Sequence, residues 1–239
     1  MDGWSFRAIS RRARRRRWSC PARSAAERWP STTRWKGFRC SRRRPGPVSR
    51  FNDRSLERLR ALLTARPAIA IDAPEYRRAA VLILLIRRDE GWSILFSRRA
   101  ANLAAHSGQI AFPGGGVEDG EALEEAAVRE AEEEVGIDRG SVELIGRLDD
   151  LITNSGFLVA PFVGTITTRI DYVLREAEVA EVFEVPMDAL LRPAQPEVRY
   201  VSFRDRNYPA YFYQYDRYEI WGLTGRMLKA FLDLVWQAV

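Results

Sequence analysis

One stretch constrains this chain more than any other, the 23 residues from 115 to 137. It reads GGVEDGEALEEAAVREAEEEVGI, and glycines at 114, 115, 116 and 120 surround its start. A helical pattern begins at about Glu121. Gly136 stands where a helix stop is expected, because glycine readily adopts the left-handed backbone that ends many helices. The stretch therefore predicts a glycine-rich loop that leads into a Glu-rich helix.

Three carboxylates gather on one side of this predicted helix. At about 100° per residue, Glu130, Glu133 and Glu134 fall within one arc of roughly 100°. Apolar residues such as Ala131 and Val135 occupy the neighbouring arc and can pack inward. Carboxylates so placed repel one another unless a cation lies between them, and ligand sets made only of oxygen suit Mg²⁺ or Mn²⁺. The pattern predicts a metal site that could hold a substrate phosphate.

A Glu-rich helix can also be no more than a solvated surface. Glutamate is a good helix former, and Glu125–Arg129 and Arg129–Glu133 are ordinary i,i+4 pairs. The order of the residues argues against this interpretation. The fixed positions of the Nudix box are all matched, by Gly115, Glu121, Arg129, Glu130, Ala131, Glu133, Glu134, Gly136 and Ile137. The chain thus resembles the Nudix hydrolases, which cut the diphosphate of a nucleoside diphosphate linked to another group.

A second motif, at residues 95–115, stands just before the box. It reads LFSRRAANLAAHSGQIAFPGG and resembles the element that marks coenzyme A diphosphatases within the Nudix superfamily. The matching positions are Arg99, Ala100, Gly108, Phe112, Pro113, Gly114 and Gly115. The family pattern differs at 95–97, where it has Leu-Leu-Thr, and at Ala104, where it has an arginine. Residues 178–186 and 220–224 also resemble this branch.

The resemblance implies a division of roles within the site. The metal ligands would be Glu130, Glu133, Glu134 and the carbonyl of Gly114. The bound ions would neutralise phosphate oxygens and lower the pKa of a water, whose proton would pass to Glu130 or Glu181. Arg129 would orient the ligand carboxylates by pairing with Glu133 or a neighbour. Glu121, on the opposite side of the helix from Glu130, would brace the loop, and Gly136 would end the helix.

The same resemblance suggests the substrate, coenzyme A or an acyl derivative, split into 3′-phospho-AMP and 4′-phosphopantetheine. Arg98, Arg99 and Gly115 are the expected substrate-binding residues. We expect Arg99 to hold the 3′-phosphate by a charge-assisted hydrogen bond, although a surface ion pair is an alternative role for it. Ala104 leaves room for another diphosphate substrate, such as ADP-ribose, NADH or an oxidised dNTP.

Charge divides the chain into two parts. The net charge is +6, yet residues 1–50 hold 16 Arg and Lys against 2 acidic residues, a charge of +14. Residues 51–239 carry the remaining 22 basic and 30 acidic residues, a charge of −8. Blocks of like charge without helical or strand periodicity are normally disordered. We therefore predict a basic arm over 1–50, disordered or mis-annotated, and a Nudix domain over 51–239.

Three interpretations of residues 1–50 compete. Arginines together with tryptophans suit phosphates and bases, so the arm could bind nucleic acid and make this a nucleic-acid-binding protein. A segment rich in Arg and Ser and poor in acids also fits a targeting sequence. We favour the third, a misplaced start or wrong reading frame in a GC-rich gene. Both cysteines, Cys20 and Cys40, lie here, so the domain should contain no disulfide and no Cys-bound metal.

Periodicity from residue 53 onward predicts alternating helices and strands. Besides the Glu-rich helix, helices are expected from about 53 to Pro67, at 187–191 and at 223–237. Strands are expected at 79–86, 92–96, 109–112, 142–148, 158–166, 179–185, 197–203 and 211–215, with a turn around 205–207. Pro161 indicates an edge strand or a bulge. These elements fit an α/β protein, and the resemblance implies a Nudix-type α/β/α sandwich with a mixed sheet.

The expected partner is the small-molecule substrate, which places the chain in nucleotide metabolism. No apolar run reaches the ~18 residues of a membrane span. We accordingly expect no membrane partner and a cytoplasmic location. We also allow for a homodimer.

Overall fold

The computed structural model describes residues 51–101, 108–193, 195–203 and 206–239. The predictions made for residues 1–50 and for Ala104 lie outside these described residues and stay predictions. The helices are α1 (Asp53–Ala65), α2 (Leu123–Val135), α3 (Met187–Leu190) and α4 (Gly222–Ala238), with a short 3-10 turn at Arg139–Ser141. The strands are β1 (Arg77–Arg88), β2 (Gly91–Arg99), β3 (Ile110–Ala111), β4 (Gly114–Gly116), β5 (Glu143–Arg147), β6 (Leu151–Ile152), β7 (Phe157–Ile166), β8 (Val179–Pro186), β9 (Glu197–Phe203), β10 (Arg206–Tyr215) and β11 (Tyr218–Ile220). None of the helices in these ranges is long and apolar enough to cross a bilayer.

Strands β1 to β8 form one mixed sheet, and β9 to β11 form a second, antiparallel one. In the large sheet β1 pairs in parallel with β7 over ten residues and antiparallel with the start of β2. The β2 residues Ser97 and Arg98 pair with β8 on one edge and with β3 on the other. Strand β3 therefore lies on the edge of β2 that faces β1. Strand β4 pairs with the opposite end of β1. Residues 110–116 therefore lie between the end of β2 and the start of β1, where these two strands do not pair with each other.

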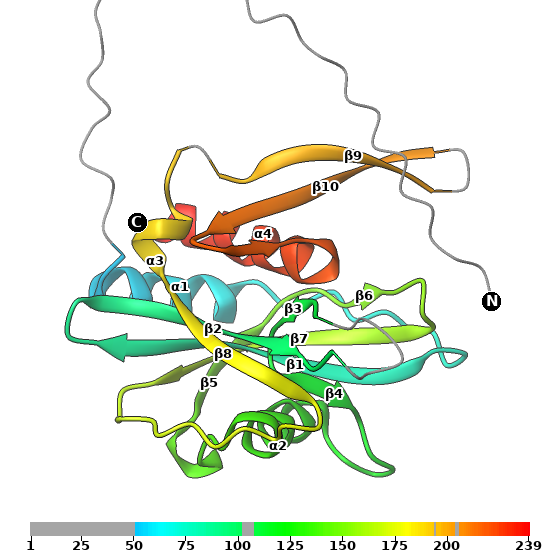
Figure 1. The fold of residues 1–239 in the computed structure, drawn as a ribbon, viewed down its shortest axis with the longest axis horizontal. Helices are drawn as coiled ribbons and strands as arrows, with labels where there is room; N and C mark the ends of the chain where they lie inside the picture. The colour runs from blue at the N-terminus through cyan, green and yellow to red at the C-terminus, as the bar shows by residue number, and fades with distance from the viewer. Residues whose placement is uncertain (1–50, 102–107, 194, 204–205) are drawn as a thin grey trace, which may run out of the picture. The chain divides into compact units, whose positions relative to one another are not determined.

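Helices cover both faces of the large sheet, which confirms the predicted α/β/α arrangement (Figure 1). On one face α1 and α4 pack against the sheet through buried side chains that include Leu59 and Phe231. On the other face α2 packs through Ala127, Ala131 and Val135. The central strand β1 alternates between the two cores, with Ile83 in the first and Leu82 in the second. Because β1 is buried on both faces, its sequence is a continuous apolar run rather than an alternating one.

Helix α2 matches the predicted Glu-rich helix, although it begins at Leu123 rather than near Glu121. Ala122 is still extended, at φ −74° and ψ 147°, and Glu125 accepts its N–H at 3.4 Å. The helix ends as predicted at Gly136, whose φ of 76° is left-handed. A Cβ at Gly136 would also lie 2.8 Å from the backbone of Val173. The α2 segment is thus fixed at both ends by local sequence.

Two local predictions were right only in part. Pro161 lies in β7, which is an interior strand because β1 pairs with one of its edges and β5 and β6 with the other, so the edge alternative was wrong. The bulge alternative was right: Arg147 pairs with Phe162 and Leu151 with Val159, so three residues, 148–150, lie opposite two, 160–161. There the carbonyl of Pro161 accepts the N–H of Leu148 at 2.8 Å. A turn was predicted around 205–207, but β10 already begins at Arg206.

Candidate active site

The glycine loop and helix α2 are brought together by the pairing of β4 with β1. Gly114 pairs with Val81 and Gly115 with Ala80, which fixes the loop across the sheet. The Gly114 N–H donates to Glu134 Oε2 at 3.3 Å. A Cβ on Gly115 would lie 2.6 Å from the Glu130 carboxylate, so that carboxylate rests directly against the Gly115 backbone. Two of the predicted metal ligands therefore lie directly against the predicted loop.

Arg129 holds the loop and the helix together. Its Nε and Nη2 donate to the two carboxylate oxygens of Glu121 at 2.7 and 3.0 Å, and Nη2 also donates to the Gly116 carbonyl at 2.9 Å. Its Nη1 donates to Glu130 at 2.9 Å and to Glu133 at 3.4 Å. These hydrogen bonds lower the pKa of Glu121 and raise that of Arg129. A bidentate guanidinium in this position fixes carboxylate direction as well as charge.

Glu121 has a second contact, which ties it to the loop. Its Oε2 accepts the N–H of Glu118 at 2.9 Å. The side chain therefore joins the loop backbone to Arg129 on the helix. This geometry agrees with the bracing role expected for Glu121.

Glu134 is the most deeply buried carboxylate of the group, with 3% of the residue exposed. Burial raises its pKa to about 7, against the effect of the Gly114 hydrogen bond, and the charge of Glu130 raises it further. Burial also raises the pKa of Glu130, opposed by its contact with Arg129 and reinforced by Glu133. Carboxylates that are buried close to one another gain stability in the charged form when a cation joins them.

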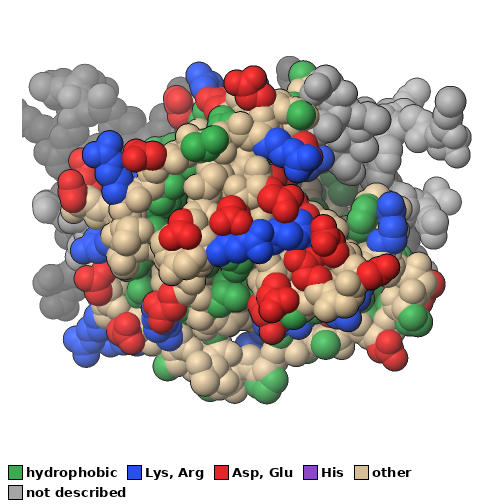
Figure 2. Space-filling model, turned by 90° about the horizontal axis from the view of Figure 1, so that it is seen from below, with side chains coloured by type: hydrophobic (Ala, Val, Ile, Leu, Met, Phe, Trp, Pro, Cys, Tyr) green, Lys and Arg blue, Asp and Glu red, His purple; other side chains and the backbone are tan. Residues whose placement is uncertain are grey.

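The donor set suits a hard divalent ion. The candidate ligands offer only oxygen atoms, from Glu130, Glu133 and Glu134 on consecutive turns of α2. They lie beside the glycines at 114–116. In the described ranges no three acidic side chains already form a metal cage. Glu130 and Glu133 are both held by Arg129 instead. The residues fit Mg²⁺ or Mn²⁺, with Glu130, Glu133 and Glu134 as the side chains that would hold it. Figure 2, seen from the α2 side, shows acidic and basic side chains interleaved over this face.

The two predicted substrate-binding arginines lie on opposite faces of the sheet. Side chains alternate along β2: Leu95 joins the α2 core and Phe96 the α4 core. Arg99 therefore faces α2, and its positive charge acts to lower the pKa of Glu134. Arg98 faces the α4 side, where its Nη2 lies 2.9 Å from Glu181 Oε2. Only Arg99 of this pair lies with the box carboxylates.

Glu181 is also on the α4 side, away from the group that we expected it to join. Its strand neighbour Val182 packs in the α2 core, whereas Phe183 packs against the α4 core. By alternation Glu181 shares the face of Phe183. There it accepts a hydrogen bond from Tyr218 at 2.6 Å and pairs with Arg217 and Arg98. The Tyr218 hydrogen bond and these cations lower the pKa of Glu181. These contacts suit Glu181 to a role as a charged partner of the two arginines rather than to a role as a general base.

Glu178 lies near the box carboxylates and was missed in the sequence. Its charge contributes to the raised pKa of both Glu130 and Glu134. Arg175 lies 3.3 Å from Glu178 and 3.7 Å from Glu133, so it joins the two. Glu178 precedes β8, and its backbone carbonyl accepts the N–H of Ala100 at 2.8 Å. The resemblance of residues 178–186 to the family indicated that this segment belongs to the site. It did not indicate whether Glu178 or Glu181 faces α2, because that depends on how β8 pairs with β2.

Comparison with known proteins shows the family of the chain. The NUDIX domain family model matches residues 76–211. The uncharacterised Nudix hydrolase NudL of Cronobacter sakazakii is 39% identical over 178 residues, which cover 74% of this chain and 91% of that protein. NudL of Escherichia coli is 37% identical over 165 residues, or 69% of this chain and 85% of that protein. The solved Nudix hydrolase RenU of M. smegmatis aligns with a TM-score of 0.41 and 24% identity, covering 48% of this chain and 73% of that one.

The family model spans more than half of the chain, and it includes the glycine loop and α2. The NudL relatives extend the similarity over most of their own length. The chain therefore belongs to the Nudix hydrolases and is a pyrophosphohydrolase that acts on diphosphates.

Proposed function

We propose that this Nudix hydrolase cleaves the diphosphate of coenzyme A or of an acyl derivative, releasing 3′-phospho-AMP and (acyl-)4′-phosphopantetheine. The observation that carries the proposal is the 95–115 element, in which Arg99 lies beside the box. The Arg99 N–H donates to the Gln109 carbonyl at 3.0 Å, and the Gly108 N–H donates to the Arg99 carbonyl at 3.2 Å. These bonds pair two described parts of the motif that resembles the coenzyme A branch.

Each side chain then has a chemical task. A divalent ion held by Glu130, Glu133 and Glu134 would supply Lewis acidity toward the phosphate oxygens and toward a bound water. Arg129 keeps Glu130 and Glu133 directed into the site. Glu130 is the proposed acceptor of the water's proton, because its carboxylate lies against the Gly115 backbone beside the residues that would hold the ion. Glu178 is the alternative acceptor, in place of Glu181.

Arg99 takes a revised task in this proposal. Because it lies near Glu134 rather than in a separate recess, it would bind the diphosphate under attack. The Nε of Arg99 is buried and has no hydrogen-bond partner among the described residues, so it can donate to a phosphate oxygen. Selection of the 3′-phosphate, which we had first expected of Arg99, then needs other residues.

A substrate panel tests the proposal. The purified chain would be given coenzyme A, dephospho-coenzyme A, ADP-ribose, NADH and an oxidised dNTP under the same Mg²⁺ and Mn²⁺ conditions. We expect kcat/KM to be highest for coenzyme A and lower for dephospho-coenzyme A. The value for ADP-ribose should be lower still, and Glu134→Gln, with its reduced turnover, serves as the control for activity at this site. Faster turnover of ADP-ribose, NADH or the dNTP would refute the coenzyme A proposal and leave the Nudix activity in place.

A further inference from the structure

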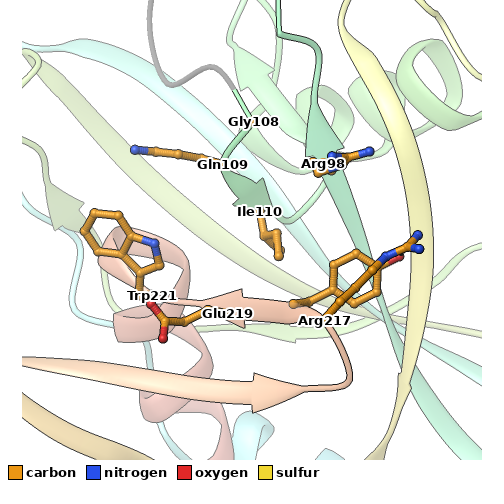
Figure 3. Close-up of a pocket in the computed structure, with 8 residues that line it drawn as sticks. Arg98, Gly108, Gln109, Ile110, Arg217, Glu219 and Trp221 are labelled. Atoms are coloured by element: carbon orange, nitrogen blue, oxygen red, sulfur yellow. The ribbon is translucent and has the colours of Figure 1, made fainter.

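A cavity of about 260 Å³ lies on the α4 face of the sheet, where β2, β3 and β11 meet. Figure 3 shows it between the sheet and the β10–β11 turn. Arg98 and Ile110 approach from the sheet, Arg217 from the turn, and Trp221 from the junction between β11 and α4. Its volume is slightly below the range of about 300–1,000 Å³ that is usual for ligand sites, so it would take only one end of a coenzyme-sized molecule. None of the roles given above accounts for it.

Two arginines of the cavity lining share a single carboxylate. Arg98 and Arg217 both pair with Glu181. The acidic lining residue Glu219 pairs with Arg199 at 3.2 Å, and Arg199 also pairs with Glu197 at 3.0 Å, so the charges of this larger group balance. Any phosphate binding therefore depends on the hydrogen-bond donors of Arg98 and Arg217 and not on an excess of charge. Arginine is the residue best suited to bind phosphate in this way, because its fork of donors can serve Glu181 and a phosphate together.

Aromatic rings form the other walls. The Trp221 indole stacks on Phe212, with ring centroids 5.7 Å apart and planes at 7°, and lines the cavity. Tyr218 stacks on Phe183 in the same way, its ring planes at 5°, and directs its hydroxyl to Glu181. The Arg217 guanidinium also lies over the Tyr218 ring, 5.0 Å from its centroid, so Trp221 is the ring that remains for a base. A ring held from behind by another ring loses little freedom when a base stacks on it. The indole suits a flat heterocycle, and the arginines suit an attached phosphate.

We propose that this cavity binds the 3′-phosphorylated adenosine end of the substrate, with Arg98 and Arg217 on the 3′-phosphate and Trp221 against the base. The proposal rests on the coenzyme A function argued above and names the residues that select it. Glu181 is then a positioning residue, which holds the two arginines side by side. It is not a catalytic residue.

The fold connects the cavity with the box. Arg98 and Arg99 are consecutive residues on opposite faces at the end of β2. In this proposal the diphosphate lies at Arg99 and the 3′-phosphate at Arg98. Coenzyme A carries both groups on one ribose, so that ribose is required to lie at this strand end. NADH and ADP-ribose offer no phosphate to the cavity.

Direct binding tests the proposal without relying on catalysis. The full chain, without added metal, would be titrated calorimetrically with adenosine 3′,5′-bisphosphate and with AMP. The two probes differ only in the 3′-phosphate. We expect the bisphosphate to bind about tenfold tighter, at the low end for charged hydrogen bonds because Arg217 is largely exposed. Arg217→Ala and Arg98→Ala should each reduce that ratio toward one.

Controls separate the cavity from general charge and from the proposed function. Arg169→Ala removes an equally charged but exposed residue, paired with Asp171 outside the cavity, and should keep the wild-type ratio. Equal binding of the two probes by the wild type, or an unchanged ratio in both cavity variants, would overturn the inference. A wild type that prefers the bisphosphate but does not cleave coenzyme A would support the cavity and refute the proposed function.

Discussion

Gly115→Ala should disable the site while leaving the fold intact. A Cβ at this position would lie 2.6 Å from the Cδ and from both oxygens of Glu130. Ordinary contact begins at 3.4 Å, so the carboxylate must withdraw by about 0.8 Å. Gly115 does not have a positive φ, and the clashing atoms are the end of a flexible side chain. The strain is therefore released by moving Glu130, without moving the backbone.

The displacement sets the expected loss. Catalytic groups must be held within about 0.5 Å of their working geometry, and a 1 Å displacement can reduce turnover by about 10²-fold. We expect kcat/KM to fall by roughly that factor and the melting temperature to change by less than about 3 °C, equivalent to about 1 kcal/mol in a domain of this size. Steady-state kinetics and a thermal melt of the same preparation measure both.

Two neighbouring glycines provide matched comparisons. At Gly114, with φ 154°, a Cβ would lie 2.4 Å from the Ala80 carbonyl and 2.6 Å from the Val81 Cα, so Gly114→Ala must shift backbone. It should lower stability by about 3 kcal/mol or more and melt about 10 °C earlier. At Gly116 a Cβ meets nothing within 4 Å, and Gly116→Ala should lose far less activity than Gly115→Ala. Equal activity of Gly115→Ala and wild type would refute the placement of Glu130.

Three further outcomes are expected. Glu134→Gln should reduce turnover by about 10²-fold or more with an unchanged circular dichroism spectrum, since even indirect losses at metal sites cost roughly 10- to 100-fold; full activity would contradict its role as a ligand. A chain that starts at Val48 should keep its melting temperature and kinetics, and unfolding of that truncation would show that residues 1–47 belong to the domain. Burial raises the pKa of Glu184, yet hydrogen bonds from Arg88 and Tyr172 lower it overall from 4.5. Its stabilisation is therefore present above about pH 4.5 and lost as the pH falls through the folded-state pKa. Glu184→Gln should lower the melting temperature at pH 7 and flatten its fall toward pH 4, and a parallel fall in both proteins would refute this.

Local patterns predicted much of the fold and the centre of the site. The helical phase of Glu130, Glu133 and Glu134, with a glycine before and after the helix, is a property of consecutive residues. The apolar run of β1 likewise depends on its own side chains, which is why its burial on both faces could be expected. These features need no knowledge of which strands pair.

Features that depend on strand register could not be predicted. Arg98 and Arg99 look like one basic pair in the sequence, but strand alternation sends them to opposite faces. An irregularity at this point, where β8 pairs Glu181 with Arg98 and Val179 with Arg99, shifts the start of β8 by one residue relative to β2. The cavity joins residues more than 100 positions apart, Arg98 and Arg217 among them. No short-range pattern marks such a contact.

The parallel pairing of β1 with β7 also determines how the chain reaches its native state. Every partner in this pairing is 80 residues away, from Arg77 with Phe157 to Ile86 with Ile166. Closing such a loop costs about 4 kcal/mol of chain entropy, apart from a constant, and topologies rich in distant contacts fold in milliseconds to seconds. Helix α2 lies inside this loop and, at 13 residues, is marginal by itself. During refolding, hydrolytic activity should therefore return with the slow phase that forms the sheet, after the earliest helical signal.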